Sequence, residues 1–355
     1  MLKKFVIGTI VLLALLTIGL IVYINTGIDL PEGADTVVEQ VMSADIPVLV
    51  TGETGVATND NVNIWYESKM PADSVKGSIL LVMGLGASAL IWDNDFCQDY
   101  VDAGYQVIRY DNRDVGQSTW MKEWDEAAPY TLDDMAKDGV AVLDALNINK
   151  AHVIGASMGG MIAQTMAINH QDRLASLTSI MSSGFMMDES IPFPDHFNQK
   201  LIKLTLKYLL FGSDADNLKF HIGNQELLKG NGGYPNNMKT SAETTLYELK
   251  KRKGYNRAAV DHQVKAIEVS GSRLEDLGKI TVPTLVIHGI SDPLVKVEHA
   301  KKYAPLIPNA TTLYIDGMGH DLPRMYRERI SSNILANIAR ATIQEPQITA
   351  VAAGD

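Results

Sequence analysis

The sequence contains a single cysteine, Cys97, among its 355 residues. One cysteine excludes a disulfide within the chain and a metal site built from several thiolates. Cys97 lies in a segment, residues 92–103, that we predict to be helical, and a buried thiol is its expected role.

Basic and aromatic residues are also scarce. Lys and Arg number 31 against 42 Asp and Glu, which gives a formal net charge of −11 at pH 7. A surface of this charge repels phosphate groups, so nucleic acid is not an expected partner. Aromatic residues make up 7% of the chain, whereas 46% of it is hydrophobic. This composition predicts a globular protein with a large core, in one large domain or two smaller ones.

An uncharged segment occupies residues 5–24, directly after Lys3 and Lys4. As a helix, its 20 residues rise about 30 Å, which suffices to cross the hydrocarbon core of a bilayer. Acidic residues follow it, at Asp29, Glu32 and Asp35. This charge asymmetry predicts a transmembrane signal anchor over residues 1–24, held in the lipid bilayer, with the rest of the chain outside the cytoplasm. Secretion after cleavage of a signal peptide is the alternative, although no A-x-A-like cleavage site follows.

Strands alternate with helices after a predicted linker over residues 25–51. The stretch GVATNDNVNIWYES, residues 55–68, predicts a hairpin that turns at Asn59, Asp60 and Asn61. Apolar runs then predict buried strands at residues 78–84, 105–111, 151–157, 174–183, 283–289 and 310–317. Wholly apolar strands that alternate with helices are typical of an α/β protein, whose parallel sheet is covered by helices on both faces.

Two segments depart from plain alternation. Thr131 and Asp134 form a capping-box pattern that predicts the start of a helix reaching to about residue 147. Residues 185–278 are mostly helical in pattern, so we predict a helical cap inserted between two parts of the core, residues 52–184 and 279–342. The basic run KKRKG, residues 250–254, is expected to be a solvated helix face, with contact to anionic lipid as the alternative. Residues 343–355 are predicted to be a loose tail.

Ser157 lies in the pattern Gly155-x-Ser157-x-Gly159, after a predicted strand and before a predicted helix. This arrangement is the nucleophile elbow, in which a sharp turn exposes the serine hydroxyl at the carboxyl edge of the sheet. Side chains at the two glycine positions would collide with the neighbouring strand and helix. A glycine-rich turn with an ordinary serine is the alternative for these residues taken alone.

Asp292 and His320 supply the other groups that an acyl-transfer serine needs, an orienting acid and a base. Asp292 follows the predicted strand 283–289 and His320 follows the strand 310–317, so both are expected at the sheet edge that carries Ser157. The chain order Ser, Asp, His is the one described for hydrolases with this elbow. Asp188 and Asp321 are the other candidates for the acid.

Two backbone N–H groups are expected to hold an oxyanion beside the serine. One belongs to Met158, the residue after the nucleophile, at the start of a helix whose free N–H groups favour negative charge. The other belongs to Leu85 in the loop MGLGAS, where Gly84 and Gly86 permit the close approach.

The chain resembles the α/β-hydrolase superfamily from about residue 52 to 342, and within it the aclacinomycin methylesterase branch. The matching stretches are LLVMG, GYQVIRYDNRDVGQS, DGVAVLDAL, AHVIGASMGGMIAQ, VPTLVIHGISDPL and IDGMGHDLP. The elbow, acid and histidine motifs are shared across the superfamily, while Met83 and the RYDNRDVGQS segment favour the methylesterase branch. The resemblance implies an eight-stranded, mostly parallel sheet, a helical cap after the sixth strand and no cofactor; no metal site is predicted. The amino-terminal membrane segment departs from that branch.

These features predict a serine carboxylic-ester hydrolase that acts through an acyl-enzyme on a small-molecule ester, with a methyl ester of a hydrophobic compound as the expected substrate. The same three side chains also support a cofactor-free perhydrolase or a C–C bond hydrolase. A membrane-tethered ligand receptor that keeps the fold without catalysis is an alternative of another class. The sequence identifies no protein partner.

Overall fold

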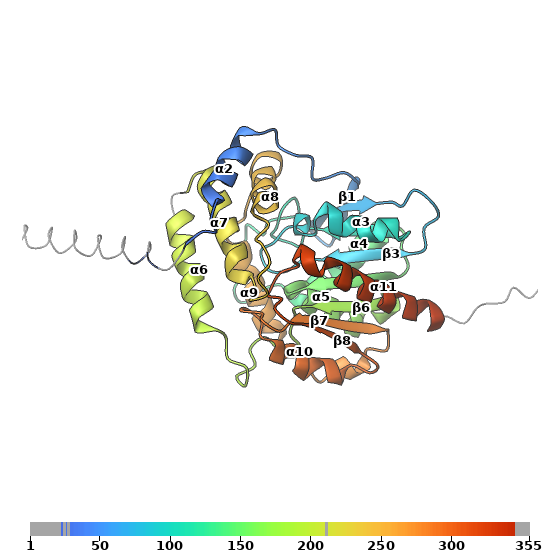
Figure 1. The fold of residues 1–355 in the computed structure, drawn as a ribbon. Coiled ribbons are helices and arrows are strands. Elements are labelled where there is room, and N and C mark those ends of the chain that lie inside the picture. Colours follow the sequence, from blue (N-terminus) through green and yellow to red (C-terminus); the bar gives the residue numbers. More distant parts are fainter. Residues whose placement is uncertain (1–22, 24–25, 27–28, 210–211, 345–355) are drawn as a thin grey trace, which may run out of the picture.

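The computed structural model of the protein describes residues 23, 26, 29–209 and 212–344 (Figure 1). The predicted membrane segment, residues 5–24, lies outside these ranges except for Tyr23. The predicted tail, residues 343–355, lies outside them from residue 345 onward, while residues 343 and 344 belong to the last helix, α11 (Arg327–Gln344). Within the described ranges, no helix is both long and apolar enough to cross a bilayer.

The described residues form one sheet of eight strands, in the order β1-β2-β4-β3-β5-β6-β7-β8. Its strands are β1 (Glu53–Asn59), β2 (Val62–Lys69), β3 (Ser78–Val82), β4 (Gln106–Tyr110), β5 (Ala151–Ala156), β6 (Leu174–Ile180), β7 (Thr284–Gly289) and β8 (Thr311–Ile315). β1 and β2 pair antiparallel, as do β2 and β4, whereas every pair from β4 to β8 is parallel. The predicted α/β-hydrolase sheet is therefore confirmed. The carboxyl ends of six parallel strands meet at one edge.

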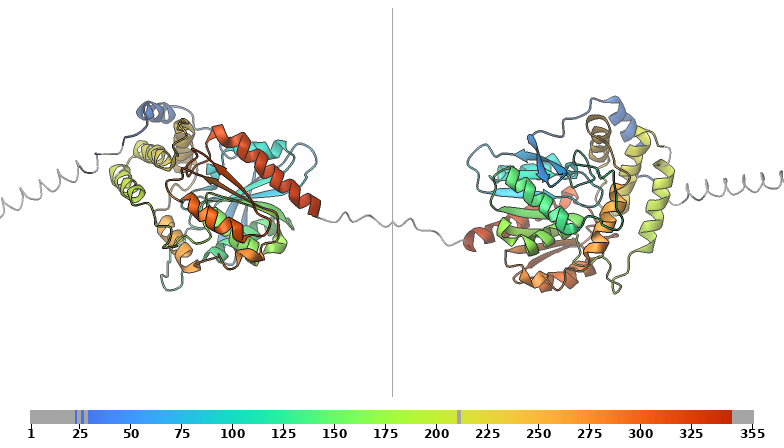
Figure 2. Two further views of the ribbon diagram at one scale, coloured as in Figure 1. Left: turned by 60° about the horizontal axis from the view of Figure 1, so that its bottom comes forward. Right: turned by 180° about the vertical axis from the view of Figure 1, so that it is seen from behind.

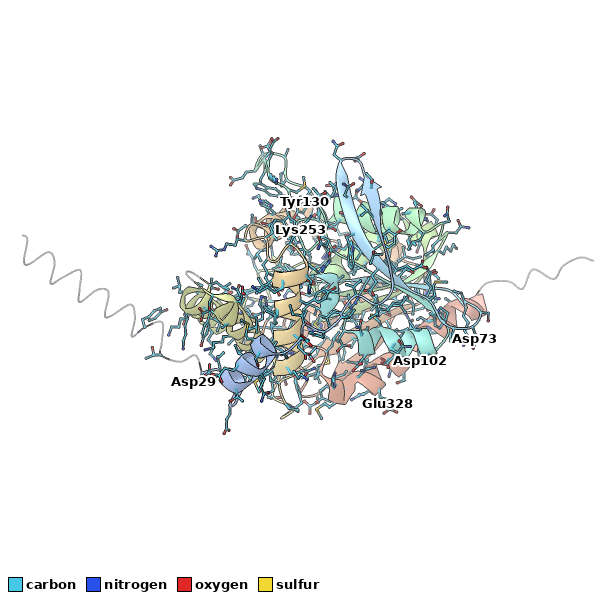
Figure 3. The ribbon with its side chains drawn as sticks, turned by 90° about the horizontal axis from the view of Figure 1, so that it is seen from above. Asp29, Asp73, Asp102, Tyr130, Lys253 and Glu328 are labelled. Atoms are coloured by element: carbon cyan, nitrogen blue, oxygen red, sulfur yellow. The ribbon has the colours of Figure 1, made fainter. Side chains whose placement is uncertain are left out.

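Alternate residues of the strands face two cores, one on each side of the sheet (Figure 2). In β3, Leu80 and Val82 belong to the core covered by α4 (Leu132–Ala145), α5 (Met158–Asn169) and α10 (Val297–Tyr303). Ile79 and Leu81 belong to the core covered by α3 (Asn94–Asp102) and α11 (Arg327–Gln344). Figure 3 shows Asp102 of α3 and Glu328 of α11 on the same side of the molecule. Because both faces are buried, β3 is apolar at every position after Ser78.

Several local predictions are confirmed. Asp60, in the hairpin between β1 and β2, has a φ of 51°, the left-handed conformation that Asp tolerates in turns. Thr131 and Asp134 form the capping box that begins α4. Cys97 is buried in α3, and burial raises the pKa of its thiol to about 11. Short 3-10 helices also occur, at η1 (Ala89–Ile91), η2 (Gln171–Arg173), η3 (Leu277–Lys279), η4 (Ala304–Leu306) and η5 (Arg324–Tyr326).

Among the described residues, four α-helices lie between β6 and β7 in the chain and form the cap (Figure 1). They are α6 (Asp195–Tyr208), α7 (Asp214–Leu228), α8 (Met238–Lys251) and α9 (Ala259–Ser270). The cap contacts the loops at the carboxyl edge of the sheet, where the N–H of His320 donates to the carbonyl of Leu228 at 2.7 Å.

The segment predicted to be a linker, residues 25–51, contains a further helix, α2 (Ala34–Ser43). Its residues Ala34, Val38 and Val41 are buried in a small core with Leu218 of α7 and Leu246 of α8. The linker prediction is corrected here: three apolar residues at helical spacing form a stripe that packs on the cap. Figure 1 shows α2 beside α7 and α8.

The prediction that residues 250–254 form a solvated helix face is wrong for the central residue, Arg252. The Arg252 side chain is only 3% exposed and lies between the carboxylates of Asp111 and Glu248. The next residue, Lys253, donates from Nζ to the carbonyl oxygens of Gln117 and Ser118. The chain leaves α8 at this point and turns against the loop after β4. That loop supplies buried acceptors which no local pattern reveals.

Candidate active site

Ser157 stands between β5, which ends at Ala156, and α5, which begins at Met158. Its φ of 56° and ψ of −122° are strained for a residue with a side chain. The neighbouring strand holds this conformation, because Ser157 N–H donates to the carbonyl of Ile180 at 2.9 Å. The hydroxyl of Ser182 in turn donates to the Ser157 carbonyl at 2.8 Å. This turn has the geometry expected of the elbow.

The two elbow glycines are required by close backbone contacts. A Cβ atom at Gly155 would lie 2.1 Å from the carbonyl oxygen of Gly159 in α5. One at Gly159 would lie 2.1 Å from the carbonyl oxygen of Val82 in β3. Any side chain at either position would therefore push the helix or the central strand away from Ser157.

Asp292 lies in the loop after β7 and His320 in the loop after β8, both at the sheet edge that carries Ser157. Asp292 Oδ2 accepts a hydrogen bond from His320 Nδ1 at 2.7 Å. The other candidate acids have different partners: Asp188 pairs with Lys302, and Asp321 accepts from the hydroxyl of Tyr234. No hydrogen bond joins His320 to Ser157 Oγ within the described residues. The structure thus connects the predicted acid and the predicted base, and it places Ser157 at the same edge.

The Asp292 carboxylate is completely buried and fully hydrogen-bonded. Its Oδ1 accepts from the N–H groups of Leu294 and Val295, each at 2.8 Å. Burial by itself raises the pKa of Asp292, but the positive charge that His320 carries when it is protonated and a hydrogen bond from His288 outweigh it, so the pKa is well below its ordinary value. Asp292 is therefore ionised and acts only as an acceptor. His320 must then donate from Nδ1, which leaves Nε2 free to take a proton.

His288 is a residue that the sequence analysis did not assign. It is buried at the end of β7, and its Nε2 lies 2.7 Å from the Val295 carbonyl and 3.4 Å from Asp292 Oδ2. Because a carbonyl only accepts, Nε2 carries a proton that also faces the carboxylate. The spacing of four residues between His288 and Asp292 is the only signal in the sequence that could have suggested this contact.

The loop after β3 approaches Ser157 closely. A Cβ atom at Gly84 would lie 3.0 Å from Ser157 Cβ, and Gly86 has a φ of 65°. The side chain of Asn112 anchors the start of this loop by donating to the Met83 carbonyl at 2.7 Å. Within the described residues, the N–H groups of Leu85 and Met158 donate no hydrogen bond. Neither predicted oxyanion donor is therefore paired with an acceptor in this part of the chain.

The cap contributes Tyr234, a second residue that the sequence did not identify. Its hydroxyl accepts from the N–H of Gly230 at 2.8 Å and from the N–H of Gly319 at 3.2 Å, and it donates to Asp321 Oδ1 at 2.8 Å. Burial raises the pKa of Asp321 to about 6. These bonds connect a cap loop to both neighbours of His320 in the chain.

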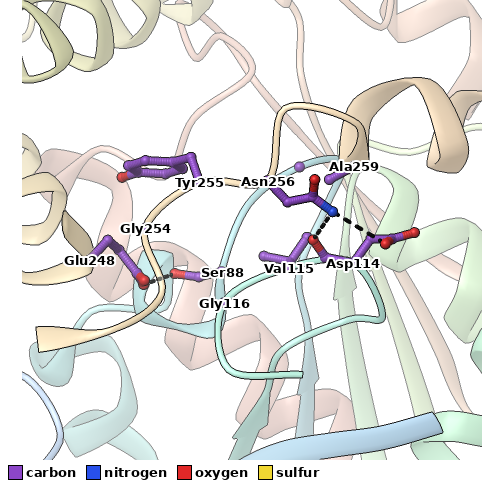
Figure 4. Close-up of a pocket in the computed structure, with 10 residues that line it drawn as sticks. Ser88, Asp114, Val115, Gly116, Glu248, Gly254, Tyr255, Asn256 and Ala259 are labelled. Atoms are coloured by element: carbon purple, nitrogen blue, oxygen red, sulfur yellow. Dashed lines mark hydrogen bonds between the residues drawn. The ribbon is translucent and has the colours of Figure 1, made fainter. Parts of the chain in front are cut away.

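A small pocket lies between the loop after β3, the loop after β4 and the cap (Figure 4). The Ser88 hydroxyl donates to Glu248 across it at 2.6 Å, and the Asn256 amide donates to the carbonyl of Asp114 at 3.1 Å. Within the described part of the chain, no group of three or more His, Cys, Asp and Glu side chains is arranged to hold a metal ion.

The chain belongs to the α/β-hydrolase family: a family model described as the alpha/beta hydrolase fold matches residues 77–323. The rhodomycin D methylesterase of Streptomyces sp. (strain C5) is 31% identical to it over 306 residues, which cover 82% of this chain and 99% of that protein. The corresponding enzyme of Streptomyces peucetius is 30% identical with the same coverage. These relatives support the predicted aclacinomycin methylesterase branch and an ester hydrolase.

Solved structures agree on the fold. A bacterial membrane phospholipase A superposes with a TM-score of 0.60 at 20% identity, over 95% of this chain and 99% of that one. A likeness at this identity shows the fold alone.

Proposed function

We propose that the protein is a serine esterase in which Ser157 is the nucleophile, His320 the general base and Asp292 the residue that orients the imidazole. The observation that carries the proposal is the 2.7 Å hydrogen bond between Asp292 and His320, at the sheet edge where Ser157 stands in a strained turn. The N–H groups of Leu85 and Met158 are the donors that would hold the oxyanion.

The reaction proceeds in two halves. His320 Nε2 takes the proton of Ser157 as Oγ attacks the ester carbonyl, and it then gives that proton to the departing alcohol. In the second half, water attacks the acyl-enzyme and gives a proton to His320, which passes it to Ser157 Oγ as the acid is released. Asp292 stabilises the imidazolium that forms in each half, and its burial from water strengthens that interaction.

A methyl ester of a hydrophobic compound is the substrate class that we propose. This proposal is supported by the similarity of the chain to two rhodomycin D methylesterases over almost their full length. We also propose that residues 5–24 anchor the enzyme in the bilayer with its catalytic domain outside the cytoplasm. The support is their uncharged composition and the preceding Lys3 and Lys4.

The test compares the wild type with Ser157→Ala on a panel of p-nitrophenyl and methyl esters. We expect turnover to fall by about 10⁴- to 10⁶-fold and labelling by a fluorophosphonate to disappear, while circular dichroism stays unchanged. Near-normal hydrolysis by Ser157→Ala would remove the proposed nucleophile. A wild type that hydrolyses no ester but forms peracid, or cleaves a C–C bond, would indicate one of the alternative reactions.

A further inference from the structure

The loop that carries Leu85 is held by the cap through one buried side chain, Gln263 of α9. Gln263 is fully buried. Its Oε1 accepts from the N–H of Gly86 at 2.7 Å, and its Nε2 donates to the carbonyl of Arg113 at 2.9 Å. Since a backbone N–H only donates and a carbonyl only accepts, the orientation of this amide is unambiguous.

The hydrogen bond from Gly86 to Gln263 holds the central peptide of a β-turn in this loop. The N–H of Ala87 donates to the carbonyl of Gly84 at 3.3 Å, so residues 84–87 form a β-turn. Gly86 has a φ of 65°, the left-handed value that its position in a type II turn requires. Type I and type II turns differ by rotation of the central peptide, here Leu85–Gly86. Gln263 binds the N–H of that peptide and so selects one of its two orientations.

The same bond occupies one of the two N–H groups in the middle of the turn. The Gly86 N–H is occupied by Gln263, whereas the neighbouring Leu85 N–H donates no hydrogen bond within the described residues. The loop is fixed on both sides of Leu85, by Asn112 at the Met83 carbonyl and by Gln263 at Gly86. Val260, one turn earlier in α9, packs on Gly86 as well: a Cβ atom at Gly86 would lie 3.0 Å from Val260 Cγ2.

We propose that Gln263 is a positioning residue that assembles the oxyanion hole from the cap, an inference that rests on the proposed esterase function. An amide is required because one atom must accept from Gly86 while the other donates to Arg113. The cap thereby takes part in catalysis: α9 has to be docked for Leu85 to present its N–H beside Ser157.

The variant Gln263→Met tests this, because it keeps the side-chain length and removes both hydrogen bonds. With p-nitrophenyl butyrate as the substrate, we expect kcat to fall by about 10- to 100-fold, while KM changes by less than about threefold. This decrease in kcat is smaller than, or close to, the decrease caused by removing a whole oxyanion donor. Phenylboronic acid, which mimics the tetrahedral intermediate, should lose affinity by the same factor as kcat/KM.

Asn337→Leu is the matched control, since it also removes a buried amide. Asn337 Nδ2 donates to the Leu177 carbonyl at 3.0 Å, near the opposite edge of the sheet. Its loss is expected to lower the thermal midpoint without changing kcat or boronate affinity. If Gln263→Met behaves like Asn337→Leu, Gln263 has only a structural role and the inference is wrong.

Gln263→Asn covers the case in which Gln263→Met does not fold. It keeps the amide but is one methylene shorter, so it cannot reach both the Gly86 N–H and the Arg113 carbonyl, and we expect kcat and boronate affinity to fall together by about tenfold. Unchanged kcat in this variant contradicts the inference. Hydrolysis that survives Ser157→Ala would instead contradict the proposed function, so the two failures are distinguishable.

Discussion

Replacement of Asp292 by Asn gives the sharpest test of the acid, because the structure determines how the new amide must lie. The N–H groups of Leu294 and Val295 both donate to Oδ1 at 2.8 Å, so the amide oxygen of Asp292→Asn has to occupy that position. Its NH2 group then takes the place of Oδ2, 2.7 Å from Nδ1 of His320. An NH2 group only donates, so His320 must present the Nδ1 lone pair and carry its proton on Nε2.

A proton on Nε2 prevents His320 from accepting the proton of Ser157. The variant also loses the buried negative charge that stabilises the imidazolium. Together these effects are expected to lower kcat by about 10⁴-fold, or about 5.5 kcal/mol of transition-state stabilisation, with substrate binding largely retained.

The assay is steady-state hydrolysis of p-nitrophenyl butyrate, with the rate of fluorophosphonate labelling as a second readout. Asp188→Asn and Asp321→Asn are the matched controls, since they replace the other two candidate acids. We expect both to keep kcat within about tenfold of the wild type. An active Asp292→Asn together with an inactive Asp321→Asn would refute the assignment of the acid.

Three further predictions concern stability and the amino terminus. Because the pKa of Asp321 is about 6 in the fold and 3.8 ordinarily, the folded protein binds this proton more tightly, and stability falls as the pH rises from about 4 to 6. Asp321→Asn is therefore expected to raise the free energy of unfolding by about 2 kcal/mol at pH 8 and by little at pH 4. Urea unfolding at the two pH values measures this difference, and equal effects at both would contradict the prediction. Deletion of residues 1–28 should leave activity intact and release the protein from membranes in a sedimentation assay, whereas a wild type that never pellets with membranes argues against the anchor. Deletion of residues 1–45 additionally removes α2 from the cap and should lower the thermal midpoint.

The sequence alone was sufficient to predict features that depend on residues close together in the chain. The two glycines around Ser157 indicate the close packing of β5, α5 and β3, and the capping box of Thr131 indicates the start of α4. The sheet and the alignment of Asp292 and His320 at one edge also follow from local patterns. A residue just after a parallel strand must lie at the carboxyl edge, whichever strands are its neighbours.

The tertiary structure alone decided the contacts between segments far apart in the chain. Gly86 and Gln263 are separated by 177 positions, and Arg252 lies 141 positions from Asp111. Neither Gln263 nor Arg252 belongs to a pattern that distinguishes it from an ordinary surface residue of a cap helix. The apolar stripe of α2 was likewise too short to predict a packed helix. Whether a polar side chain is buried depends on the partner that folding brings to it, since only a fully satisfied hydrogen-bonding group is stable away from water.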